Sequence, residues 1–114
     1  MKNLQSSINA IYSDADAKAV SAIIDQADAI NNLLDNAHAS MRICECADAM
    51  TFVASAVEAY EELLEMAENC TSFTLKGAFL DAFGIVKLNR PELPTGVEYT
   101  LKARAMKCIE EIIK

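Results

Sequence analysis

The stretch "DNAHASMRICECADAM" (residues 35–50) decides the fold, because the pattern of apolar residues changes phase within it. Before and after it, apolar residues recur at spacings of three and four, as on a buried helix face. The first seam consists of Val20, Ile23, Ala27, Ile30, Leu34, Ala37, Met41 and Cys44. The second consists of Ile43, Cys46, Met50, Val53, Val57, Tyr60, Leu64 and Ala67. The two seams are offset by two residues, which rotates the apolar face by about 200° around a helix.

A break between two helices explains this change of phase more simply than a continuous helix does. Asn36 can end a helix and Ser40 can cap the next one, so the break is expected within residues 35–40. We therefore predict a helical hairpin with helices at about 14–37 and 41–70. A single long bent helix is the alternative.

Composition indicates an all-α fold in one domain, residues 1–114. Glycine and proline are absent from residues 1–76, whereas a β protein needs frequent turns. A short helix at about 2–12 should precede the hairpin, and a C-terminal helical pair should follow it in a bundle-like arrangement. The first helix of that pair is expected to start at Thr71 or Ser72 and stop at Gly84, and the second to start at Thr95.

Negative charge is concentrated in the hairpin. The chain carries a net charge of −7. The acidic hairpin (about 14–70) contrasts with a mildly basic C-terminal pair (about 71–114). One helix face carries a row of glutamates without lysines at partner spacing, namely Glu58, Glu61, Glu62, Glu65 and Glu68. This acidic face is either a solvated surface that keeps the protein soluble or a docking surface for a basic partner.

The cysteines do not form a recognisable metal or redox motif. If residues 41–50 are helical, Cys44 and Cys46 point about 200° apart, so they cannot share a metal ion or form a disulfide. His38 is the only histidine, and no second cysteine pair follows at zinc-ligand spacing. We expect packing cysteines, no metal site and no cofactor. A thiol-based metal or redox protein remains the third functional hypothesis.

Other functional classes find little support in the sequence. No nucleotide-binding or nucleophile motif is present, so we predict that the protein is not an enzyme. A helix-turn-helix within 74–94 would place two prolines in its recognition helix, and the acidic charge disfavours direct nucleic-acid binding. No signal-peptide core or membrane-spanning run is seen, so a cytoplasmic protein without membrane contact is expected.

The helix expected at 41–70 carries one more apolar row beside its seam. This row comprises Phe52, Ala56, Ala59, Leu63 and Met66. The two rows together cover a wide arc, and a soluble monomer rarely leaves such a surface open. The row is therefore expected to serve dimer or helix packing, and we predict a twofold homodimer.

The preferred function is a small, acidic, cytosolic, non-catalytic interaction protein. Such a regulator or adaptor would act through helix-surface contacts with a protein partner, and a basic partner would suit its acidic face. The alternative is an acidic, DNA-mimic-type inhibitor of a basic nucleic-acid-handling enzyme, as in small phage or prophage proteins. Binding by mimicry should weaken steeply with salt, whereas an apolar helix contact should not.

Overall fold

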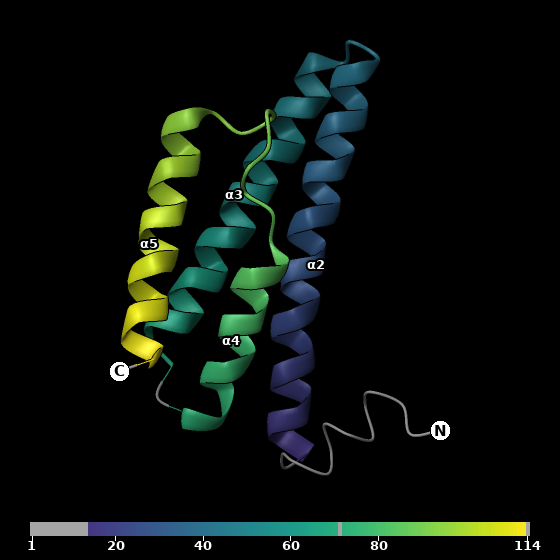
Figure 1. Ribbon diagram of the computed structural model, residues 1–114. Helices are drawn as coiled ribbons and strands as arrows, with labels where there is room; N and C mark the ends of the chain where they lie inside the picture. The colour runs from purple at the N-terminus through teal and green to yellow at the C-terminus, as the bar shows by residue number, and fades with distance from the viewer. Residues whose placement is uncertain (1–13, 71, 114) are drawn as a thin grey trace.

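A computed structural model describes residues 14–70 and 72–113, which form four α-helices and no strand. Helices α2 (Asp14–Arg42) and α3 (Cys46–Glu68) form a long antiparallel hairpin (Figure 1). Helices α4 (Phe73–Ile85) and α5 (Thr95–Ile113) follow as a C-terminal pair. The all-helical fold is confirmed. The short helix predicted at about 2–12 lies outside the described residues.

The hairpin turn lies later than predicted, at residues 43–45 instead of 35–40. Cys44 adopts a left-handed conformation with φ of 63°. Its N–H donates to the Met41 carbonyl at 3.1 Å, and the Glu45 N–H donates to the Ser40 carbonyl at 2.8 Å. This pair of bonds is the Schellman pattern that ends a helix. The prediction was wrong because the turn uses a cysteine where glycine is usual, while Asn36 and Ser40 lie within α2.

The first seam is buried as predicted from Val20 to Ala37, along most of α2. On α3, Tyr60 and Leu64 of the second seam are buried together with Leu63 of the neighbouring row. Helix α4 packs against α2 and α5 packs against α3, so the C-terminal pair covers much of the hairpin (Figure 1). The rings of Tyr60 and Phe83, on α3 and α4, lie 6.1 Å apart between centroids.

Helix α4 runs through Gly84 and ends at Ile85, so the predicted stop at Gly84 was wrong. A side chain from α2 holds this helix end. The Asn31 amide donates to the Ile85 carbonyl at 2.8 Å and accepts from the Lys87 N–H at 3.0 Å. Residues 86–94, which we call the strap, then lead without helix from α4 to α5.

Candidate partner-docking groove

An open groove of about 460 Å³ lies beside the N-terminal half of α3. Residues of α2, α3, the strap and the start of α5 form its walls. They are Met41, Cys46, Ala49, Met50, Val53, Ala54, Val57, Glu58, Glu61, Glu92, Pro94 and Val97. A second hollow of about 470 Å³ shares Val57, Glu61, Pro94 and Val97 with it and extends toward Leu101. The wall from Cys46 to Glu61 extends about 22 Å along α3, the length of about four turns of a helix.

The groove has apolar walls because part of the apolar side of α3 is left uncovered near the hairpin turn. The hairpin extends beyond α4 and α5 at this end (Figure 1). Met50 is 73% exposed, and Met41 and Ile43 are also exposed, although the sequence predicted all three in buried seams. Methionine side chains are flexible and polarisable, so they adapt to differently shaped apolar partners.

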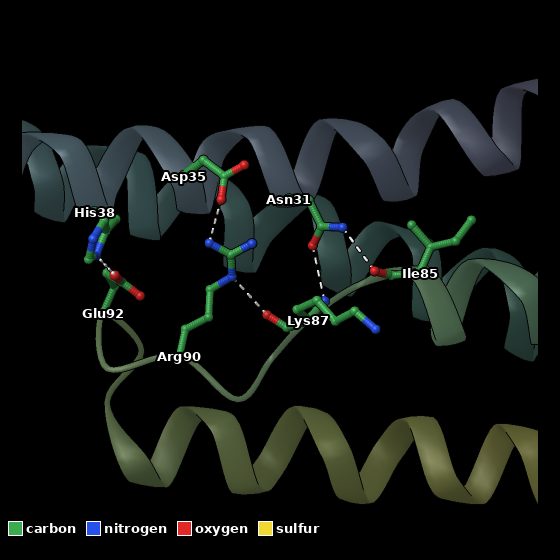
Figure 2. Close-up of polar contacts among 7 residues, drawn as sticks. All are labelled: Asn31, Asp35, His38, Ile85, Lys87, Arg90 and Glu92. Carbon is green, nitrogen blue, oxygen red and sulfur yellow. Dashed lines mark hydrogen bonds and ion pairs between the residues drawn. The ribbon is translucent and has the colours of Figure 1, made fainter.

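The strap is fixed to one polar row on α2. Asn31 holds its beginning, as described above, and Asp35 accepts a hydrogen bond from Arg90 at 2.6 Å. His38 shares a hydrogen bond with Glu92 (Figure 2). Arg90 also donates through Nε to the Lys87 carbonyl at 3.1 Å, which braces the strap internally. These contacts place Glu92 and Pro94 in the wall of the groove.

Glu92 is the most unusual polar group of the groove. Its side chain is only 3% exposed. One carboxylate oxygen, Oε1, contacts His38, but the buried Oε2 has no hydrogen-bond partner within the described part of the chain. Buried polar atoms are nearly always hydrogen-bonded, because leaving one unpaired costs free energy. This carboxylate therefore retains unused acceptor capacity beside an apolar wall.

The predicted acidic face is divided by the structure into parts with different surroundings. Glu58 and Glu61 line the groove. Glu68 is bound by Arg104 of α5 at 2.7 Å, whereas Glu62 and Glu65 are exposed and line none of the groove. Among the described residues, the groove wall contains three carboxylates and no Lys, Arg or His. A cationic partner is the one whose charge complements this wall.

The predicted packing row on α3 is partly used within the chain itself. Ala56 and Leu63 are buried in the core of the single chain. Phe52 and Ala59 are half-buried, and Met66 is exposed. The homodimer stays a prediction, and its surface on this row would be limited to these last three residues. Light scattering during size exclusion would contradict it by showing the mass of one chain at all concentrations.

The four cysteines are free and occupy different environments. Cys44 and Cys46 are both exposed, Cys70 is half-buried and Cys108 is buried. The expectation that residues 41–50 form one helix was wrong, because Cys44 lies in the turn between α2 and α3. Cys46 lies in the wall of the groove. Burial raises the pKa of the Cys108 thiol, with Glu68 and Glu111 adding to the shift. Within residues 14–70 and 72–113, no three His, Cys, Asp or Glu side chains are grouped to hold a metal ion.

Glu92 and the row that fixes the strap were missed by sequence reasoning. Asn31, Asp35 and His38 follow the buried residues Ile30, Leu34 and Ala37 by one position each. A polar row at spacings of four and three beside an apolar seam indicates a second contact line on the same helix. That signal could have been read, but it does not reveal which distant segment makes the contact.

Comparison with known proteins finds no matching family model, no similar characterised protein and no similar solved structure. What this chain does must therefore be inferred from its own residues. None of the described helices is long and apolar enough to cross a membrane.

Proposed function

We propose that this chain is a small non-catalytic interaction protein, a regulator or adaptor, that binds a helical segment of a protein partner in the groove beside α3. The observation that carries this proposal is an apolar groove with only acidic charges in its wall. Amphipathic helices commonly bind by laying their apolar face into such grooves. The groove's length of about four helical turns suits a segment of this kind.

The exposed methionines support the same function. Met50 and Met41 flank a wall formed by Val53, Val57 and Val97. Large apolar side chains gathered in a groove of a soluble chain are typical of contact surfaces. Methionine-lined grooves in particular accommodate helices of varied sequence. A regulator with several related partners would use such a surface.

The alternative, an inhibitor that imitates nucleic acid, has weaker support. Mimicry needs a row of open negative charges, but Arg104 binds Glu68 and Arg90 binds Asp35. Glu58, Glu61, Glu62 and Glu65 remain exposed for such a role. Raising the salt concentration separates the two functions, because screening weakens exposed charge pairs much more than apolar contacts.

Capture of partners by two matched variants tests the proposal. Met50→Asp places a charge in the groove, and Met66→Asp makes the same change on the exposed part of α3 outside it. The tagged wild-type chain and both variants are mixed with host lysate, and the bound proteins are identified by mass spectrometry. We expect Met50→Asp to lose the wild-type partner and Met66→Asp to retain it.

The proposal is wrong if Met50→Asp captures the same proteins as the wild-type chain in the same amounts. Loss of capture at raised salt by the wild-type chain, with both variants behaving alike, would favour nucleic-acid mimicry. Circular dichroism of the two variants checks that each remains helical.

A further inference from the structure

The unpaired oxygen of Glu92 indicates which group a partner brings into the groove. The side chain is 97% buried, since only 3% of it is exposed, and Oε2 lacks a partner within the described part of the chain. His38 of α2 holds this carboxylate of the strap through its bond to Oε1. A buried carboxylate kept half-satisfied by a fixed scaffold is completed when a ligand donates to it.

The chemistry of the surroundings restricts that ligand. Val53, Val57 and Pro94 give the groove an apolar wall, and Glu58 and Glu61 add negative charge to it. The ligand should combine an apolar stem with a positively charged donor. Lysine and arginine have this form, since their methylene stems pack on apolar surface while the head group seeks a carboxylate.

We infer that the groove selects amphipathic helices that insert a lysine or arginine from their apolar face, with its cationic head bound to Oε2 of Glu92. This inference rests on the proposed function and names its specificity-determining contact. Because His38 occupies Oε1, only the buried Oε2 is unpaired, and a single N–H of the partner that reaches this atom completes it. Glu58 and Glu61 favour the same charge without being buried.

A double-mutant cycle with model peptides tests this contact. The probes are two synthetic 18-residue amphipathic helices with leucines on one face and glutamines elsewhere. One carries an arginine in the centre of the leucine face, and the other carries the neutral isostere citrulline there. Affinities are measured by fluorescence anisotropy for the wild-type chain, Glu92→Gln and the control Glu62→Gln, whose carboxylate lies outside the groove.

We expect the wild-type chain and Glu62→Gln to bind the arginine peptide about tenfold more tightly than the citrulline peptide, as for a hydrogen bond to a charged group. Glu92→Gln should lower this ratio to about one. Equal affinities of the wild-type chain for both peptides would overturn the inference, and that comparison needs no variant to fold. An unchanged preference in a folded Glu92→Gln variant would overturn it too, because the exposed glutamates would then supply the selectivity.

The two proposals fail in different ways in this experiment. If both peptides bind equally and Met50→Asp abolishes both, the groove binds helices and only the role of Glu92 is wrong. If the wild-type chain binds neither peptide, the proposed function is wrong and the inference falls with it.

Discussion

The two ends of the α2–α3 hairpin have similar apolar spacing in the sequence but different surroundings. At the end near Asp14 and Glu68, α4 and α5 cover the hairpin, and Leu63 is fully buried. At the turn end, the helices extend past their cover and Met50 is 73% exposed. In the sequence, Leu63 and Met50 each belong to a row of apolar residues at spacings of three and four. The difference teaches that an amphipathic pattern predicts apolar surface, whereas the neighbouring elements decide whether that surface becomes core or contact site.

The two ends should differ most in how much free energy of unfolding is lost when an apolar side chain is truncated to alanine. Leu63→Ala leaves a cavity in the core and should lower the free energy of unfolding by about 3 kcal/mol. Met50→Ala removes an exposed side chain and should change it by less than about 0.5 kcal/mol. Urea denaturation measures both. Comparable losses in the two variants would show that the turn end is covered in solution.

Tyr60 should make the covered end sensitive to alkali. Burial, with a smaller effect of Cys108, raises the pKa of Tyr60 from 10.0 to about 12. The tyrosine of the unfolded chain loses its proton first, so this contribution is fully present below pH 10 and is lost as the pH rises to about 12. The loss amounts to about 2–3 kcal/mol. Denaturation at a series of pH values should show it, and Tyr60→Phe should remove this part of the dependence.

The contact between α2 and the strap at Asn31 lies between the covered end and the turn end of the hairpin. Asn31→Ala removes both hydrogen bonds that hold the end of α4 and should destabilise the fold by about 1–2 kcal/mol. Asn32→Ala, at the exposed neighbouring position, should have little effect. Exchange of the Lys87 amide hydrogen, followed by NMR, should become faster in Asn31→Ala only. Unchanged exchange would mean that Asn31 does not hold the strap.

The smallest effect is expected at the hairpin turn. Cys44 has positive φ, which is costly for any residue with a Cβ, so Cys44→Gly should raise the free energy of unfolding by about 1 kcal/mol. Cys44→Ala keeps the Cβ and should remain within about 0.5 kcal/mol of wild type. Thermal unfolding distinguishes the two. A destabilised Cys44→Gly variant would show that the cysteine side chain makes a contact of its own.

The sequence predicts the helices well and the turn between them less well. The buried face of α2 was predicted from spacing, because the apolar residues between Val20 and Ala37 recur every three or four positions, as on the buried face of a helix. The turn was placed several residues early because no glycine marks it and Cys44 takes the left-handed conformation. Helix periodicity reports which residues share a face, but it does not report where a tight turn without glycine falls.

The candidate site was only partly predictable. The row of glutamates drew attention to Glu58 and Glu61, which line the groove. Met50 was assigned to a buried seam, and Glu92 was not recognised at all. Their roles depend on where α5 and the strap lie, and contacts such as His38 to Glu92 join residues 54 positions apart. A single sequence contains no local pattern for such contacts.

The strap also has a consequence for the order in which the molecule folds. Helices α2 and α3 are joined by three residues, so their pairing closes a short loop, whereas the strap contacts on α2 join residues 54 to 56 positions apart. Loop closure costs more entropy as the loop lengthens, and contacts between distant residues form late. We expect the hairpin to form first and the groove wall last. The same wall should then open in brief excursions from the native state while the hairpin persists, which native-state hydrogen exchange can detect as weaker protection of the strap than of α3.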